Sequence, residues 1–330
     1  MLTRALAILL AAILVALSAC GGGGDDDGGS AAPAPEPVAA SPADFPSSKG
    51  KTLEQLNAGL EQGAILAPSS ATSLRPGREN RFGFAIVDLA NKQIDVSEVA
   101  VYTARQDGTQ LRGPFVARKE SLDVATPYRS AQTASDLANG KTFYVAEPEF
   151  GSAGAHIAIG LVRLDGRFVV ADSPMALKVG AKNGPPDVGD RAIRVHTETG
   201  ADVGGDLRRL STRVPPAPEL LKTDFADVVG RKPVVLLFAT PALCASRTCG
   251  PVVDIAEQVR AQSGKGVTFI QQEIYKDNDP GKPVRDQVAT WRLPTEPWAF
   301  VIDRAGKVAA RFEGVFSVGE LARAVARVKQ

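Results

Sequence analysis

The feature that most constrains the fold of this chain is the segment Lys232–Phe238, where an unbroken run of valine, leucine and phenylalanine follows Pro233. Such a run predicts a strand buried on both faces of a sheet. A helix is expected from Pro251, because a proline loses no hydrogen bond at a helix start. Its apolar positions have helical spacing, at Val252, Ile255, Ala256 and Val259. The loop between strand and helix carries Cys244 and Cys249.

Alternating patterns continue to the end of the chain. The expected elements are a strand at 267–270, a helix at 284–291, a hairpin of 298–302 with 307–312 and a last helix after 317. Ser317 and Glu320 form a capping box for that helix. Its apolar face is Val318, Leu321, Val325 and Val328. The order is therefore strand, cysteine loop, helix, strand, helix, strand, strand, helix.

This order, together with the segment Trp291–Val308, resembles membrane-anchored thioredoxin-like proteins of bacteria. The resemblance implies an α/β thioredoxin-like domain over 219–330. It also implies that Pro297 is a cis-proline facing the cysteines, with Pro294 as the alternative. Glu296 then lies where the backbone pairs with a bound peptide, so Pro297 and Glu296 are the expected substrate-binding residues; a solvated loop position is the other interpretation of Glu296.

Three positions depart from that family. Four residues separate Cys244 from Cys249 where the family usually has two, and Leu243 stands in place of a tryptophan. Leu237 stands where thioredoxins commonly carry a buried carboxylate that accepts a proton. These departures predict an activity that is slower than, or different from, that of a thioredoxin.

Disulfide exchange needs a thiolate nucleophile and a second thiol to resolve the mixed disulfide. Cys244 and Cys249 are the expected catalytic pair. The start of the helix and the nearby Arg247 would stabilise a thiolate at Cys249. Family precedent instead makes the first cysteine the attacking residue, so the two roles stay open.

The beginning of the chain predicts export. Arg4 precedes an apolar run over 5–17 that is shorter than the about 20 residues of a membrane span. The run ends in Leu17-Ser18-Ala19-Cys20, which resembles the lipobox of bacterial lipoproteins. That resemblance implies a signal peptide over 1–19 and a lipid on Cys20; a simple secretion signal is the alternative. The Gly-, Asp-, Pro- and Ala-rich stretch 20–47 is expected to be a disordered tether.

Two further regions complete the predicted organisation. Residues 48–180 contain short alternating runs from Arg81 onward and turn signals such as Asp165-Gly166, which predict an all-β sandwich. The sandwich looks like the immunoglobulin-like modules of exported proteins, which serve as spacers or docking surfaces. Residues 181–218 are rich in Gly, Pro, Asp and Arg, and we expect a linker that partly packs on the last domain.

Charge and composition exclude several partners. Lys and Arg number 38 against 37 Asp and Glu, so the chain has no basic excess for a nucleic acid. Only His156, His196, Met1 and Met175 offer imidazole or thioether ligands, too few for a copper site. We therefore expect no metal and no cofactor.

The leading hypothesis is a thiol-disulfide oxidoreductase on the outer face of the bacterial cytoplasmic membrane. Its partners would be thiols or disulfides of exported proteins and an electron donor that the sequence does not identify. The alternative is an envelope scaffold or binding lipoprotein in which the disulfide is structural. Closing the six residues from Cys244 to Cys249 stabilises by only about 2 kcal/mol, against about 4.7 kcal/mol for a 100-residue loop, which favours redox use. A third hypothesis, thiol peroxidase, rests on Ser246 three residues before Cys249.

Overall fold

The computed structural model describes residues 40–135, 141–173, 175–180, 183–244 and 249–329, which belong to one compact unit, Pro35–Gln330. The predicted signal peptide, Cys20 and most of the predicted tether lie outside the described residues, as do Ser246 and Arg247. Within the described ranges, no helix combines the length and the apolar character needed to cross a membrane.

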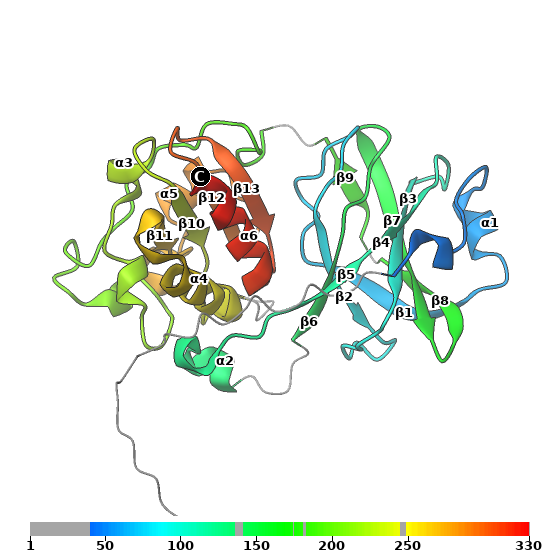
Figure 1. Cartoon of the computed structure of the whole chain (residues 1–330), viewed down its shortest axis with the longest axis horizontal. Helices are drawn as coiled ribbons and strands as arrows, with labels where there is room; N and C mark the ends of the chain where they lie inside the picture. Colours follow the sequence, from blue (N-terminus) through cyan, green and yellow to red (C-terminus); the bar gives the residue numbers. More distant parts are fainter. Residues whose placement is uncertain (1–39, 136–140, 174, 181–182, 245–248, 330) are drawn as a thin grey trace, which may run out of the picture. The chain divides into compact units, whose positions relative to one another are not determined.

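The first half of the described chain forms a nine-stranded sheet (Figure 1). Its strands are β1 (Glu61–Pro68), β2 (Phe82–Val87), β3 (Val99–Arg105), β4 (Arg112–Val116), β5 (Arg118–Ser121), β6 (Thr142–Ala146), β7 (Gly154–Leu164), β8 (Arg167–Asp172) and β9 (Leu177–Val179). The strand order is β4-β3-β7-β8-β1-β2-β6-β5, and β9 pairs with β7. Short helices accompany them: η1 (Pro42–Asp44), α1 (Leu53–Asn57), η2 (Thr126–Tyr128) and α2 (Ala131–Ser135).

The sheet confirms the strand-rich region and departs from an all-antiparallel arrangement at one strand. β1 pairs antiparallel with β2 but parallel with β8, so that it joins the two halves of the sheet. The sequence did not reveal β1, because its first residues are Glu61, Gln62 and Gly63, which are poor strand formers. Its later residues alternate, with Ala64 and Leu66 buried in the core.

The second sheet has the strand order β11-β10-β12-β13. Its strands are β10 (Val234–Phe238), β11 (Thr268–Gln272), β12 (Trp298–Ile302) and β13 (Val308–Glu313). β10 and β11 are parallel, whereas β12 is antiparallel to both β10 and β13. The helices are η3 (Leu207–Arg209), η4 (Pro218–Leu220), α3 (Phe225–Val228), α4 (Cys249–Ser263), η5 (Gly264–Gly266), η6 (Lys276–Asn278), α5 (Asp286–Thr290) and α6 (Val318–Val328). This arrangement confirms the thioredoxin-like fold expected for this part of the chain.

The apolar run of β10 is explained by cover on both faces of the sheet. Val235 and Leu237 pack in the core cluster that includes residues of α4 and α6. Val234, Leu236 and Phe238 pack on the opposite face, in a cluster with Trp291. All five strand residues are buried. Helix α4 therefore packs directly on this sheet. It begins at Cys249, two residues before the predicted start at Pro251.

The last helix begins as the sequence predicted. The hydroxyl of Ser317 accepts a hydrogen bond from the Glu320 amide at 3.1 Å, and the Ser317 amide donates to the Glu320 carboxylate at 3.2 Å. The same carboxylate receives two bonds of 2.8 Å from Arg81, which precedes β2. Although burial alone would raise it, the charges of Arg81 and Arg118 hold the pKa of Glu320 below its ordinary value. This buried acid therefore ties the two sheets together.

Residues of the segment that the sequence predicts as a linker contact the second sheet. The Gly189 amide donates to the Val308 carbonyl at 2.8 Å, and the Ala192 amide donates to the Gly306 carbonyl at 2.9 Å. The apolar side chains of Ile193 and Val195 pack against the core cluster of Trp291. His196, placed in this segment by the sequence, is bound to Asp224 at 2.6 Å, and His156 is buried against the ring of Phe150.

Candidate functional site

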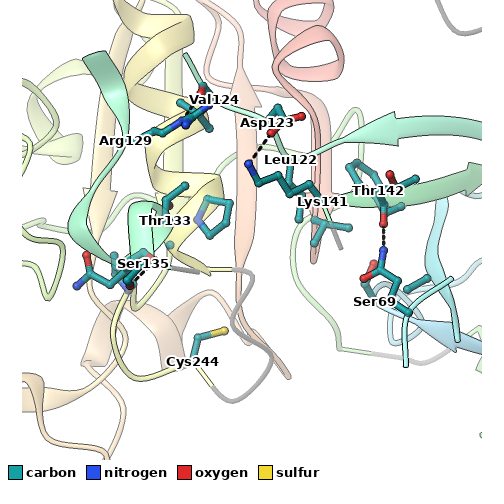
Figure 2. Close-up of a pocket in the computed structure, with 18 of the residues that line it drawn as sticks. Ser69, Leu122, Asp123, Val124, Arg129, Thr133, Ser135, Lys141, Thr142 and Cys244 are labelled. Atoms are coloured by element: carbon teal, nitrogen blue, oxygen red, sulfur yellow. Dashed lines mark hydrogen bonds and ion pairs between the residues drawn. The ribbon is translucent and has the colours of Figure 1, made fainter. Parts of the chain in front are cut away.

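The two cysteines lie at one edge of the second sheet, between the end of β10 and the start of α4. They form a disulfide with Cα atoms 5.9 Å apart. Cys249 is the first residue of α4 and is completely buried in the core cluster. Cys244 is only partly buried and lines a cleft, where Figure 2 shows its side chain. The pair therefore presents one accessible sulfur and one sheltered sulfur.

The position of Cys249 gives its sulfur a favourable field. The free amides of a first helical turn carry partial positive charge, and α4 extends for 15 residues behind Cys249. A thiolate formed on this sulfur after reduction is stabilised by that charge, which makes Cys249 a good leaving group in exchange.

Pro297 lies at the same edge of the sheet as the cysteine loop. The Glu296–Pro297 bond is cis, whereas Pro294 is not among the prolines that follow a cis bond in the described chain. Trp298, the next residue, pairs with Phe238, the last residue of β10 before the loop. The strand register thus places Pro297 beside the beginning of the cysteine loop.

Glu296 is half-buried and does not extend freely into solvent. Burial raises the pKa of its carboxyl, and a hydrogen bond from Tyr275 partly opposes that shift. The Tyr275 hydroxyl lies 3.5 Å from the Glu296 carboxylate. The carboxyl is therefore held against a neighbour at the rim of the site.

Glu273 is a buried acid that the sequence reading did not identify. It follows β11 directly and is completely buried. Its carboxylate accepts from the Ile274 amide at 3.0 Å and from the Thr212 amide at 2.9 Å. The Thr212 hydroxyl donates to Glu273 at 3.0 Å and accepts from the amide of Ala242, two residues before Cys244, at 3.1 Å. Glu273 thus supports the cysteine loop through Thr212.

A signal for Glu273 was present in the sequence. The carboxyl ends of parallel neighbouring strands lie at one edge of a sheet. β10 and β11 are such neighbours, so a charged residue just after β11 is expected beside the loop that follows β10. The position that we compared with thioredoxins, Leu237, lies inside β10 and packs in the core instead.

A segment of the first sheet region reaches the cysteine helix. This arm, residues 122–135, leaves β5 and includes η2 and α2. Asp254 of α4 accepts from the amide and hydroxyl of Ser130 at 2.7 and 2.9 Å. The other oxygen of Asp254 is 2.7 Å from Nε of Arg213, whose Nη2 donates to the Tyr128 carbonyl at 2.8 Å. Asp254 and Arg213 are both buried, so this ion pair fixes the arm to the helix that begins at Cys249.

The arm, the first sheet and the cysteine loop enclose a cleft of about 700 Å³, which we name the Cys244 cleft (Figure 2). It is lined by parts of β1, β2 and β6, the arm, Cys244 and the start of α4. Asp123 of the arm pairs with Lys141 at 3.0 Å on its wall. The volume is within the range of ligand sites in proteins, about 300–1,000 Å³.

Three solved structures each resemble less than half of this chain. A candidate thiol:disulfide interchange protein DsbE from Chlorobium tepidum is 18% identical, with 44% of this chain and 99% of that protein covered, at a TM-score of 0.31. A thiol:disulfide interchange protein of the thioredoxin family from Chlorobium tepidum TLS is 16% identical, with 46% and 99% covered, at 0.29. A thioredoxin-like superfamily protein is 17% identical, with 33% and 86% covered, at 0.25. No protein-family model and no curated protein matches the chain. The fold therefore rests on the strand order and directions described above.

Glu273 gives a prediction for the pH dependence of stability. Burial raises the pKa of its carboxyl above the ordinary value of 4.5. Above pH 4.5 the unfolded chain loses a proton that the folded chain keeps, so the free energy of unfolding contributed by Glu273 falls as pH rises. Chemical denaturation from acid to neutral pH measures the free energy of unfolding of wild type and Glu273→Gln. As pH rises, this free energy should increase for the variant relative to wild type. If the free energy of unfolding had the same pH dependence in both proteins, this account of Glu273 would be contradicted.

Asp254 gives a prediction for the arm. Asp254→Ala leaves the Arg213 guanidinium and the Ser130 amide buried without their acceptor, and should lower the free energy of unfolding by about 3 kcal/mol. Hydrogen exchange of the amides in the arm should accelerate more than that of the first sheet. Lys282→Ala, which removes an exposed ion pair with Asp277, is the control. Its free energy of unfolding should be close to that of wild type. An arm whose exchange is unchanged in Asp254→Ala would show that the ion pair does not hold it.

Proposed function

We propose that this protein is a membrane-anchored thiol-disulfide oxidoreductase that exchanges disulfides with exported proteins through Cys244 and Cys249. The observation that carries the proposal is the disulfide itself, which joins a partly exposed sulfur on a cleft wall to a buried sulfur at a helix start. A small disulfide ring at the edge of a sheet adds little stability, whereas its position suits exchange.

The oxidising direction proceeds in two displacements. A substrate thiolate attacks the sulfur of Cys244, the bond to Cys249 breaks, and Cys249 leaves as a thiolate stabilised by the start of α4. A second substrate thiolate then attacks the substrate sulfur of the mixed disulfide, which releases Cys244 as a thiolate. The substrate loses two electrons and the cysteine pair gains two. The reverse sequence reduces a substrate disulfide and needs an external dithiol to regenerate the pair.

Accessibility supports one assignment of the two roles that the sequence left open. Cys244 faces the cleft and would carry the mixed disulfide, while the buried Cys249 would resolve it. Pro297 and Glu296, at the same edge, would contact the backbone of the bound substrate. Glu273 is proposed as a positioning residue, because its hydrogen bonds reach the cysteine loop through Thr212.

The membrane anchor is supported by the sequence of the leader. We propose cleavage before Cys20, a lipid on its sulfur, and a tether over residues 20–47 that holds the folded part at the outer face of the cytoplasmic membrane. We also propose that the first sheet is an immunoglobulin-like module. The order β4-β3-β7-β8 on one side and β1-β2-β6-β5 on the other supports this, because it corresponds to the two sheets of such a sandwich joined by their first strand.

A purely structural disulfide in an envelope scaffold is the second candidate. The complete burial of Cys249 favours it, since a sheltered sulfur exchanges slowly. The two candidates differ in whether the pair reacts with an external disulfide.

A series of Cys→Ser variants of the full chain tests the proposal. Cys244→Ser and Cys249→Ser should each lose dithiol-dependent reduction of a protein disulfide but stay in the membrane fraction. Cys249→Ser should in addition accumulate a mixed disulfide on Cys244, because no resolving thiol remains. Cys20→Ser should keep the exchange activity in vitro and appear in the soluble fraction. Exchange activity that survives in both Cys244→Ser and Cys249→Ser would overturn the proposed function, and membrane retention of Cys20→Ser would overturn the anchor.

A further inference from the structure

The Cys244 cleft is built by two regions that are far apart in the sequence. Cys244 and Pro251 line one part of it, while residues of β1, β2 and β6 line another (Figure 2). The arm contributes Val124, Thr133 and Ser135 between them. A molecule that reacts with Cys244 from this cleft therefore also contacts the first sheet.

The sheet wall of the cleft is made of small side chains. In β2, Phe84 and Ile86 point into the core, whereas Ala85 between them is only partly buried and lines the cleft. Ala85 is paired in register with Ala67 of β1, which lines the cleft as well. Two alanines at adjacent positions leave depth in front of the sheet that larger side chains would fill.

The arm wall is held in place before any ligand binds. Ser130 is bonded to Asp254, and the Gln132 side chain donates to the Thr212 carbonyl at 2.8 Å and accepts from the Val214 amide at 3.2 Å. A wall that is already ordered loses little entropy on binding. The cleft is therefore a formed site on the arm side.

The charge of the cleft is positive. Its charged lining residues are Asp123, Arg129 and Lys141, and Asp123 is neutralised by Lys141. Arg129 donates its Nε to the Val124 carbonyl at 2.7 Å. Although burial alone would raise the pKa of Asp123, the charge of Arg129 acts with that of Lys141 to lower it. Two cations face one carboxylate on this wall, so one positive charge remains for a ligand, and Arg129 is the cation that is not ion-paired with Asp123 among the described residues.

We propose that the Cys244 cleft binds an extended polypeptide segment that carries a cysteine and, beside it, an acidic residue that pairs with Arg129. This inference rests on the proposed exchange at Cys244 and names its substrate class. The cysteine of the segment lies at Cys244 and its chain runs between the arm and the alanines of β1 and β2. A convex folded surface does not enter a cleft with walls on opposite sides, and a small disulfide leaves most of its volume empty.

The experiment compares three disulfide substrates with the reduced full chain. Two are synthetic peptides with an internal disulfide, identical except for Glu or Gln beside one cysteine, and the third is hydroxyethyl disulfide. Wild type should show a higher kcat/KM for the Glu peptide than for the Gln peptide. Binding of each oxidised, fluorescently labelled peptide to the oxidised chain is measured in parallel by anisotropy, because binding does not depend on turnover.

Two variants and one control decide the outcome. Ala85→Trp fills the sheet wall and should lower the ratio of the kcat/KM for peptide to that for hydroxyethyl disulfide by about tenfold, with weaker peptide binding. Arg129→Gln should bring the ratio of the kcat/KM for the Glu peptide to that for the Gln peptide close to one. Gln62→Trp places the same side chain on an exposed part of β1 outside the cleft and should leave both ratios at wild-type values. Circular dichroism melting confirms that each variant is folded.

The results separate this inference from the proposed function. Folded Ala85→Trp with wild-type peptide binding and an unchanged ratio overturns the polypeptide cleft while exchange at the cysteines stands. Equal use of the two peptides by wild type overturns the role of Arg129. Cleft-dependent peptide binding without turnover of any of the three disulfides supports the binding site and overturns the exchange activity.

Discussion

The buried ion pair of Arg213 with Asp254 is the interaction on which the arrangement of the site depends. Asp254 is on the helix that begins at Cys249, and its carboxylate also receives the amide and hydroxyl of Ser130 from the arm. Arg213 belongs to the segment between the two sheets and also donates to the Tyr128 carbonyl. One carboxylate thus holds three distant parts of the chain together. All of its hydrogen bonds are buried away from water, and hydrogen bonds are electrostatically stronger in such an environment. The arm lies beside the cysteines because of this pair.

The chemistry of the site follows from the edge of the second sheet. Parallel pairing of β10 with β11 brings the cysteine loop and Glu273 to one edge, and antiparallel pairing of β10 with β12 brings Pro297 there as well. Cover on both faces of the sheet buries Cys249, while the loop leaves Cys244 at the cleft. An accessible sulfur, a sheltered sulfur and a supporting acid therefore result from strand pairing together with the cover on the sheet.

Local patterns in the sequence predicted the elements whose burial is set by near neighbours. Three local features were predicted correctly: the apolar run that ends at Phe238, the helix that follows the cysteine loop and the capping box of Ser317. Each depends on residues that are close together in the sequence. β1 and the arm were missed, because their places depend on pairing with residues far along the chain. Glu273 was missed because its signal lies in the parallel pairing of β10 with β11 and not in its own sequence neighbours. β1 pairs with β8 about a hundred residues later, and the arm is held by Asp254, 124 residues after Ser130. For the same reason, the sequence did not predict that strands of the first sheet line part of the Cys244 cleft.

The central claim is that Cys244 and Cys249 cycle between disulfide and dithiol, and the reduction potential of the pair tests it most directly. Thiol trapping of the full chain across a graded redox buffer gives that potential. The account predicts a value among those of exchanging proteins, about −120 to −270 mV. A value below about −300 mV would contradict it, because a bridge that stable is a structural one.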